Sequence, residues 1–326
     1  YMAVNADESE PGTCKDRVIM REDPHGLVEG CLLAAHAMRL DAVYIYVRGE
    51  YRLPYDRVFA AIAEARKAGL VGQNILGSDF SCEIHMHKGA GAYICGEETG
   101  LMESLEGKRG HPRPKPPFPA GFGLWGQPTT VNNVETIFNV PFILERGAEW
   151  FRGMGNEKSP GNFLCGISGH VEKPGVYELP LGMPARQVLE EYAGGDSLKA
   201  AGSMFGTGAM IMLDDQASVV KSALVLMNFY DHESCGQCSQ CREGTQWLSQ
   251  IFQRLYDGGG RTEDIQLLTD LANGMAPGKT ICALSDAAAI PTHSVVRNFK
   301  EELELYVQHG GHQGVLAARK LEGVGA

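Results

Sequence analysis

Three cysteines within seven residues constrain this chain more than any other feature of its sequence. Cys235, Cys238 and Cys241 are each separated by two residues within the segment Glu233–Gly244. Three thiolates at this spacing can bind one face of an iron–sulfur cubane, with the fourth ligand supplied from elsewhere in the chain. Cys282 is the best candidate for the fourth ligand, because it lies in the same helical region after a Pro-Gly break.

Structural zinc is the alternative interpretation of this cluster. Zinc sites usually consist of two separated pairs of ligands, so three thiols plus one distant thiol favour a [4Fe–4S] cluster instead. The remaining cysteines are interpreted as small buried hydrophobic side chains; they are Cys14, Cys31, Cys82, Cys95 and Cys165. An odd total of nine, without dispersed pairs, indicates a reducing compartment rather than a secreted disulfide framework.

Composition excludes several classes of protein. With 44% hydrophobic and 21% charged residues over 326 positions, the chain is typical of globular proteins. Its net charge of −11 argues against nucleic-acid binding by bulk charge. The longest apolar stretches are too short to cross a bilayer, so no direct membrane insertion is expected. Because the chain opens on Tyr1 in a strand-like run, we expect an N-terminal part to be missing.

The first part of the chain alternates strand and helix patterns. We expect strands at Tyr1–Val4, Ala42–Val47 and Cys82–His87, separated by helices at Leu27–Met38 and Tyr55–Ala68. This alternation predicts a mostly parallel sheet covered by helices, with ligands at the carboxyl ends of its strands. The loops 5–16 and 88–100 follow two of these strand ends.

The rest of the chain suggests two further parts. A small α+β module should contain strands at Phe163–Ser168 and Val176–Leu179 and a helix at Pro184–Tyr192. From Ser218 the pattern is helical, with expected helices at Ser222–Tyr230, Thr245–Tyr256, Glu263–Met275, Asp286–Ile290 and Thr292–Gln308. The predicted domains are therefore residues 1–160, 161–217 and 218–326.

A glycine-rich loop joins the strand ending near His87 to an expected helix at Glu97–Leu105. Its Gly89, Gly91 and Gly96 can bring backbone N–H groups close to a phosphate. The spacing matches neither the GxGxxG dinucleotide motif nor a P-loop. The alternative is that these glycines only permit tight packing of strand against helix.

Polar residues gather around the same strand ends. Acids follow the first strand and begin the helix after the glycine-rich loop; they are Asp7, Glu8, Glu10, Glu97 and Glu98. A cofactor rich in hydroxyl and amide donors would give such a group of acids a function, although helix-terminal acids also serve as dipole partners. Lys115 and Phe118 offer a cation for phosphate and a ring for adenine stacking, and Asn132 and Asn133 offer hydrogen bonds to a flavin.

Five segments, in one order, carry a family resemblance. They are Asn5–Arg17, Gly89–Leu101, Lys115–Pro119, Pro128–Thr136 and Glu233–Gly244. Together they resemble the NADH-binding flavoprotein subunit of respiratory complex I, NADH:quinone oxidoreductase. The diaphorase subunits of NAD-linked hydrogenases and formate dehydrogenases are related to this family.

The resemblance implies an α/β fold with a Rossmann-like FMN/NADH domain, a ubiquitin-like β-grasp module and a C-terminal helical bundle holding one [4Fe–4S] cluster. It places Glu10 and Glu98 as catalytic residues on the NADH side, with Lys115 and Phe118. It implies FMN contacts from Asn5, Asp7, Glu8, Gly89, Gly91, Tyr93, Gly96, Glu97, Asn132 and Asn133. It makes Cys235, Cys238, Cys241 and Cys282 the cluster ligands.

The resemblance also implies partners and a location. The partners are the small thioredoxin-like [2Fe–2S] subunit and the large multi-cluster iron–sulfur subunit of complex I. The location is peripheral, on the cytoplasmic side of a bacterial inner membrane or in the mitochondrial matrix. A soluble diaphorase subunit is the alternative enzyme, and the absence of further cysteines after Cys282 favours complex I. A zinc-stabilised scaffold subunit is the alternative outside enzymes.

Two departures from the family pattern give further expectations. A first glycine-rich flavin loop should precede Tyr1. The β-grasp module is also short, because Gly195 is followed directly by Asp196. Two or three strands with an exposed apolar face are not independently stable, so we expect additional residues, forming a strand and a mobile loop, between these two positions.

Overall fold

The computed structural model describes residues 1–188 and 206–321. The chain forms two compact units, Tyr1–Met212 and Leu213–Ala326. The finer division at residues 160 and 217 remains a prediction. The expected insertion between Gly195 and Asp196 lies outside the described residues.

The first unit is built on a four-stranded parallel sheet in the order β3-β2-β1-β4. The strands are β1 Met2–Ala6, β2 Ala42–Val47, β3 Glu83–Lys88 and β4 Thr130–Asn133. β1 lies between β2 and β4, and Asn5 is paired with Tyr46 on one side and Asn133 on the other. The predicted parallel sheet is confirmed, with boundaries within two residues of those expected for β1 and β3.

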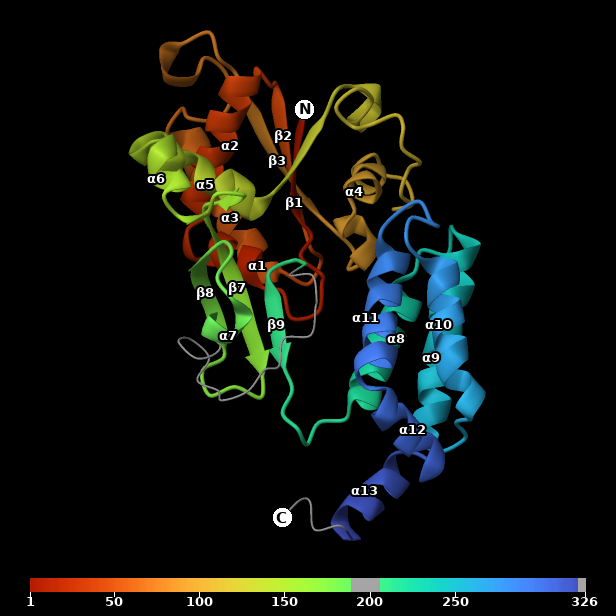
Figure 1. The fold of residues 1–326 in the computed structure, drawn as a ribbon. Coiled ribbons are helices and arrows are strands. Elements are labelled where there is room, and N and C mark those ends of the chain that lie inside the picture. The colour runs from red at the N-terminus through yellow and green to blue at the C-terminus, as the bar shows by residue number, and fades with distance from the viewer. Residues whose placement is uncertain (189–205, 322–326) are drawn as a thin grey trace. The chain divides into compact units, whose positions relative to one another are not determined.

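Helices cover the sheet on both faces (Figure 1). On one face lie α1 Lys15–Glu22, α2 Pro24–Met38, α3 Arg52–Lys67 and α5 Val134–Arg146, and α4 Glu98–Leu105 lies on the other. The short α6 Ala148–Arg152 follows α5. The sequence pattern did not predict α1, which begins inside the segment interpreted as an acidic loop.

Burial explains why these segments form a parallel sheet. β2 is an almost continuous apolar run, and its Val43, Ile45 and Val47 are fully buried. Strands covered by helices on both faces lose the alternation that marks half-exposed strands. The core also includes Leu27 and Cys31 of α2, so the interpretation of Cys31 as a buried hydrophobic side chain is confirmed.

A second sheet belongs to the same unit. It contains β7 Asn162–Gly169, β8 Gly175–Pro180 and β9 Ala209–Met212, with β8 antiparallel and β9 parallel to β7. The two-residue strands β5 Gly155–Asn156 and β6 Ser159–Pro160 precede it, and the helix α7 Ala185–Val188 follows β8. Cys165, Ile167 and Leu179 form the centre of its small core.

The second unit is helical in its described part. Its helices are α8 Val219–Glu233, α9 Ser239–Asp257, α10 Thr262–Met275, α11 Leu284–Asn298, α12 Lys300–Gln308 and α13 His312–Leu321. The expected break at Pro291 was wrong, because α11 continues through it and ends before Phe299. Proline removes one helical hydrogen bond, but burial of Ala288, Ala289 and Thr292 around it holds the helix together.

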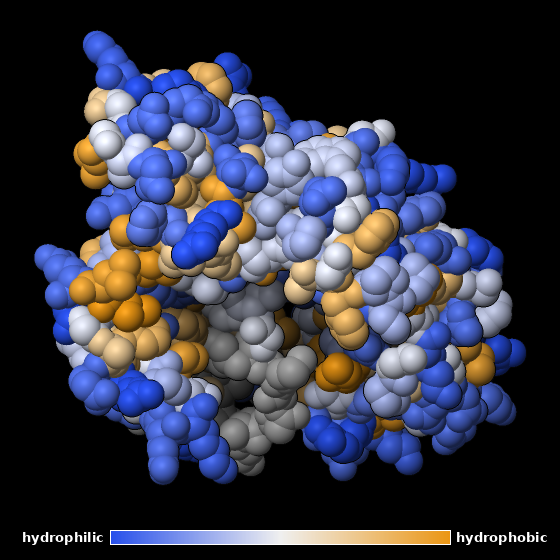
Figure 2. Space-filling model, turned by 90° about the horizontal axis from the view of Figure 1, so that it is seen from above, coloured by the Kyte–Doolittle hydropathy of each residue, from blue (hydrophilic) through white to orange (hydrophobic). Residues whose placement is uncertain are grey.

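The surface is largely polar. Hydrophilic side chains dominate the face drawn in Figure 2, and apolar side chains form separate patches there. Among the helices that the structure describes, none combines the length and the hydropathy needed to cross a bilayer.

Gly30 of α2 provides a test of this packing. A Cβ at Gly30 would lie 2.2 Å from the backbone oxygen of Ile137 in α5, so Gly30→Ala forces two helices apart. We expect it to lower the free energy of unfolding by about 1–3 kcal/mol in urea denaturation. Gly274→Ala in α10, where a Cβ meets nothing within 4 Å, should be neutral or stabilising by about 1 kcal/mol. Equal effects of the two substitutions would contradict the close approach of α2 and α5.

Candidate functional site

The carboxyl ends of β1 and β4 lie side by side and define the first candidate site. The chain passes from β1 to β2 on one side of the sheet, while β4 pairs on the other side of β1. Such a reversal leaves a crevice at the strand ends, where ligands of open α/β sheets bind. Asn5 lies at this point, and its Nδ2 donates to the backbone oxygen of Gly96, at a distance of 2.8 Å. The first strand end and the glycine-rich loop are therefore in direct contact.

The glycine-rich loop leaves β3 and leads through the 3-10 turn Tyr93–Gly96 into α4. Gly91 has a φ of +88°, which favours glycine, and a Cβ at Gly89 would lie 3.0 Å from the ring of Tyr46. Among the described residues, the N–H groups of Ala90 and Ala92, like that of Gly91, donate to no other group. Adjacent N–H groups without acceptors fit a phosphate, so the loop fits a flavin mononucleotide.

The acidic loop after β1 touches the same site, but its acids have different surroundings. The hydroxyl of Tyr93 donates to Glu10 at 2.5 Å, which joins the acidic loop to the glycine-rich loop. Glu8 is buried and accepts hydrogen bonds from the backbone N–H groups of Asp16 at 2.8 Å and Arg17 at 3.1 Å. Glu8 therefore caps the unpredicted helix α1. Burial raises the pKa of Glu8, and the charge of Asp16 raises it further.

Asp7 is also buried, and it accepts a hydrogen bond from the hydroxyl of Ser9. Its backbone N–H donates to Asn5 Oδ1 at 3.1 Å. Asp7 thus lies beside Asn5 at the end of β1, as the predicted site requires.

The two acids that begin α4, Glu97 and Glu98, share Lys115 as a partner. Glu97 is the N-cap of α4 and accepts from the N–H groups of Thr99 at 2.8 Å and Gly100 at 2.9 Å. Lys115 donates to Glu97 at 3.1 Å and to Glu98 as well. Burial lowers the pKa of Lys115, but its bonds to Glu98 and Glu97 outweigh this and raise it, so the lysine remains charged. The cation expected for a phosphate is therefore held by two carboxylates in this structure.

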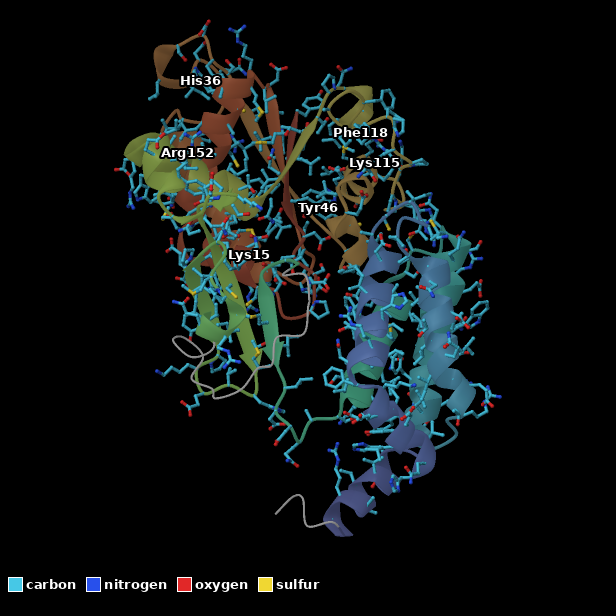
Figure 3. The ribbon with its side chains drawn as sticks, viewed as in Figure 1. Lys15, His36, Tyr46, Lys115, Phe118 and Arg152 are labelled. Carbon is cyan, nitrogen blue, oxygen red and sulfur yellow. The ribbon has the colours of Figure 1, made fainter. Side chains whose placement is uncertain are left out.

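Glu98 and Phe118 line one pocket of about 380 Å³, whose other walls include Tyr1, Met38 and Val131. Cofactor pockets commonly occupy about 300–1,000 Å³ and combine apolar walls with a few polar groups. Phe118 is 61% exposed, and Figure 3 labels it and Lys115 on the proline-rich segment. An exposed ring on the same segment as a cation is suited to stacking a base near a phosphate.

The two asparagines at the end of β4 differ. Asn133 caps α5, accepting the N–H of Glu135 at 3.0 Å, and its Nδ2 donates to Asp16 at 2.6 Å. Asn132 donates to the hydroxyl of Thr130 at 2.9 Å, and its Oδ1 accepts no hydrogen bond in the described part of the chain. Of the two amides, Asn132 has the greater capacity for a ligand.

Sequence reasoning missed the residues that hold the proline-rich segment. Arg113 donates to Glu106 at 2.7 Å and to the backbone oxygen of Gly123 at 3.1 Å, and it also bonds Glu103. The N–H of Trp125 donates to Glu106 at 2.8 Å. The available signal was two acids three positions apart, at and just after the end of the predicted helix Glu97–Leu105, close to an arginine among prolines. This cluster fixes the segment that carries Lys115 and Phe118.

The second candidate site is formed by the cysteines of the second unit. Cys238 is the N-cap of α9, and Cys241 lies in its first turn. The hydroxyl of Ser234 lies 3.4 Å from the sulfur of Cys241, and the N–H of Ile281 donates to the sulfur of Cys238 at 3.5 Å. This last bond brings the residue before Cys282 to the three-cysteine loop. Burial raises the pKa of the Cys241 thiol, and the neighbouring Cys235 and Cys238 raise it further.

The surroundings of the cysteines fit a cluster. Among the described residues, no three His, Cys, Asp or Glu side chains converge on one point. The N–H of Ile281 is directed at the sulfur of Cys238, and ligand sulfurs of a [4Fe–4S] cluster accept hydrogen bonds of this kind.

Comparison with known families agrees with both sites. Residues 1–142 match the model for the Nuo51 FMN-binding domain, and residues 221–306 match the NADH-ubiquinone oxidoreductase-F iron-sulfur binding region. Residues 165–207 match the SLBB domain. The matches define a flavin-binding and iron–sulfur-binding oxidoreductase, which confirms the expected cofactors and fold class.

Individual relatives identify the family. The F subunit of NADH-quinone oxidoreductase from Rickettsia bellii (strain OSU 85-389) is 47% identical over 94% of this chain and 82% of its own length. The corresponding protein of Mycobacterium bovis is 48% identical, over 95% of this chain and 76% of its own. The chain belongs to the family of NADH-quinone oxidoreductase F subunits. The Rickettsia alignment extends over 341 residues, so that relative carries internal residues that this 326-residue chain lacks.

A solved structure supports the related alternative. The NAD⁺-reducing [NiFe]-hydrogenase in the H2-reduced state superposes with a TM-score of 0.85 at 32% identity. The match covers all of this chain and 60% of that one. The expected relationship to NAD-linked hydrogenases is thereby confirmed.

The contribution of the Glu106 carboxylate to stability can be tested by varying the pH. Burial alone raises the pKa of Glu106, but hydrogen bonds from Lys108, Arg113 and the N–H of Trp125 lower it from 4.5 to about 2. An acid with a depressed pKa stabilises the fold above its unfolded pKa, and this contribution is lost as pH falls through the folded value. Glu106→Gln should therefore cost about 1–3 kcal/mol in the free energy of unfolding at neutral pH, and less on acidification towards pH 2.

Glu149→Gln provides the control for this measurement. Glu149 pairs with Arg152 on the surface, with an exposed fraction of 87%, so its loss should change the free energy of unfolding by less than about 1 kcal/mol. A cost of Glu106→Gln that does not vary with pH would show that the carboxylate charge is not what stabilises this segment.

Proposed function

We propose that this chain is the NADH-oxidising subunit of an NADH-quinone oxidoreductase, which takes electrons from NADH through FMN and passes them singly to a [4Fe–4S] cluster. The observation that carries this proposal is the presence of two fitted sites in one chain, at the β1/β4 strand ends and at the cysteine loop before α9. The sequence identity to the relatives from Rickettsia and Mycobacterium, over most of both chains, supports the same function.

The first unit would hold the flavin. Polar side chains and backbone groups at the strand ends would contact it. They belong to Asn5, Asp7, Gly89, Gly91, Tyr93, Gly96 and Asn132. Glu8, Glu97 and Asn133 cap helices, so they hold the helices that border the site in addition to lying beside the flavin. When bound, FMN accepts a hydride and releases electrons one at a time, and the transfer needs no acid or base from the protein. The task of these residues is to position the flavin ring.

The NADH side would be formed by Glu10, Glu98, Lys115 and Phe118. Glu98 and Phe118 share the 380 Å³ pocket, which supports their assignment to one ligand. Lys115 must exchange a carboxylate partner for a phosphate when the dinucleotide binds. The nearby carboxylates repel the diphosphate, and this repulsion limits how tightly NAD⁺ is retained.

In the second unit, Cys235, Cys238, Cys241 and Cys282 would ligate the cluster. The Ile281 N–H and the Ser234 hydroxyl would remain near the ligand sulfurs. Hydrogen bonds to ligand sulfurs stabilise the reduced form of such clusters. This chain therefore supplies ligands and polar neighbours from two segments of one helical unit.

Membership of the family supports an assignment of partners and location. We assign the chain to a multisubunit complex, next to a small thioredoxin-like [2Fe–2S] subunit and a large multi-cluster iron–sulfur subunit. It would be peripheral, on the cytoplasmic side of a bacterial inner membrane or in the mitochondrial matrix.

A diaphorase subunit of an NAD-linked hydrogenase is the second candidate, favoured by the TM-score of 0.85. The identity of 47% to the Rickettsia relative against 32% to the hydrogenase chain supports the quinone oxidoreductase. The subunits that co-purify with the chain distinguish the two.

Cys238→Ala should remove the cluster and leave flavin bound. The protein purified anaerobically should contain about four irons and four acid-labile sulfides. The variant should lose both while retaining FMN, because the two sites lie in different units. Cys82→Ala, in the core of the first unit, should leave the iron content unchanged. Stoichiometric zinc without sulfide would reject the cluster.

Glu98→Gln should impair the reaction with NADH more than it impairs FMN retention. Losing one charged hydrogen bond costs about 1.5–3 kcal/mol, or tenfold to a hundredfold in affinity. The measurement is kcat and KM for NADH with ferricyanide as acceptor, beside the FMN content. Glu29→Gln, on an exposed position of α2, serves as the control. Unchanged kinetic constants would remove Glu98 from the site.

A further inference from the structure

Lys15 is a largely buried cation beside the flavin site that the proposed function does not use. Its side chain is 12% exposed, and its ammonium group lies 2.7 Å from Asp16 Oδ1, 3.0 Å from Glu135 Oε2 and 2.9 Å from Asn133 Oδ1. An ammonium group has three donors, so all three are matched by acceptors. Figure 3 places Lys15 at α1, below the strands.

The acceptors of Lys15 are also hydrogen-bonded to one another, because Asp16 and Glu135 both bind Asn133. The second oxygen of Asp16 accepts from Asn133 Nδ2 at 2.6 Å, and Asn133 Oδ1 accepts from the N–H of Glu135. Asn133 Nδ2 also lies 3.4 Å from the backbone oxygen of Asn5, its partner in the β1/β4 register. Both ends of the Asn133 amide are thus held by charged groups, and its orientation is determined by this network.

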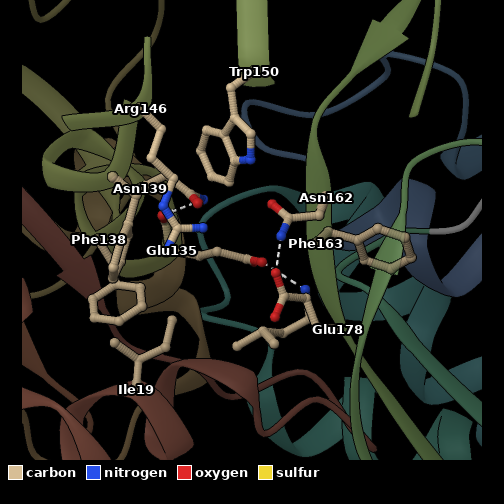
Figure 4. A pocket seen from close by; sticks show the side chains of 11 residues that line it. Ile19, Glu135, Phe138, Asn139, Arg146, Trp150, Asn162, Phe163 and Glu178 are labelled. Atoms are coloured by element: carbon tan, nitrogen blue, oxygen red, sulfur yellow. Dashed lines mark hydrogen bonds between the residues drawn. The ribbon is translucent and has the colours of Figure 1, made fainter. Parts of the chain in front are cut away.

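Glu135 extends the network to the second sheet of the first unit. One of its oxygens binds Lys15, and the other accepts the N–H of Leu164 in β7 at 2.6 Å. Figure 4 shows the Glu135 side chain reaching from α5 towards β7. Its carboxylate is only 13% exposed, so water competes little for these bonds. The ends of β1 and β4 are therefore linked to β7 through one ion pair.

We propose that Lys15 and Glu135 are positioning residues for the flavin site: their ion pair orients Asn133, and with it the β1/β4 strand ends, and links that position to β7. The inference rests on the proposed function, because FMN is the group whose binding is affected. Neither residue needs to touch the cofactor. Removing the cation leaves the carboxylates of Asp16 and Glu135, only 3% and 13% exposed, without their counter-ion, and Asn133 then reorients.

The test is the dissociation constant of FMN, measured by flavin fluorescence on the full chain after removal of its flavin. Lys15→Met should weaken FMN binding by about tenfold to a hundredfold. Lys15→Arg keeps the charge and should restore most of the affinity. Arg66→Met breaks the exposed Arg66–Glu83 pair at the opposite end of the sheet and should leave the constant unchanged.

A double-mutant cycle separates positioning from a general structural effect. In an Asn133→Ala background, Lys15→Met should change the FMN constant less than about twofold, because its route to the flavin has been removed. Fully additive effects would overturn the proposal.

If the Lys15→Met variant does not fold, Glu135→Gln tests the positioning role instead. It keeps an oxygen for the Leu164 N–H and removes only the charge, and it should weaken FMN binding by about tenfold. Wild-type affinity in folded Glu135→Gln and Lys15→Met variants would refute the positioning role and leave the proposed function standing. A wild-type chain that binds no FMN would refute the proposed function itself.

Discussion

The parallel pairing of β1 between β2 and β4 is the constraint on which the first unit depends. It brings Asn5 next to Asn133 and places the carboxyl ends of the four parallel strands at one edge of the sheet. Loops that are distant in the sequence meet there, as the contacts of Asn5 with Gly96 and of Tyr93 with Glu10 show. The register of the sheet therefore determines which loops meet at the site.

The charged side chains around the site have partners within the chain. Glu8 caps α1, Glu97 caps α4, and Lys115 is held by Glu97 and Glu98. Binding of a phosphate at Lys115 must therefore replace an existing carboxylate partner. Capping acids keep the helices in place while the glycine-rich loop provides the N–H groups for phosphate. The same chain segments thus serve stability and recognition.

The sequence predicted much of this arrangement, because its strongest signals are local. Apolar runs predicted β2 and the helices that flank it, and the cysteine spacing predicted the loop before α9. The missed elements depend on distant contacts. Helix α1 is capped by Glu8, which lies outside it, and α11 continues through Pro291 because its neighbours are buried. The network of Lys15 with Asn133 and Glu135 joins residues more than a hundred positions apart, which no local pattern reveals.

Anaerobic addition of NADH to the purified full chain, followed by its visible absorbance, tests the central claim most directly. We expect a flavin absorbance that bleaches with about one and a half NADH per flavin, because the flavin accepts two electrons, the cluster accepts one and each NADH supplies two. A chain that carries no flavin, or a flavin that NADH does not bleach, would contradict the proposed oxidation of NADH through FMN.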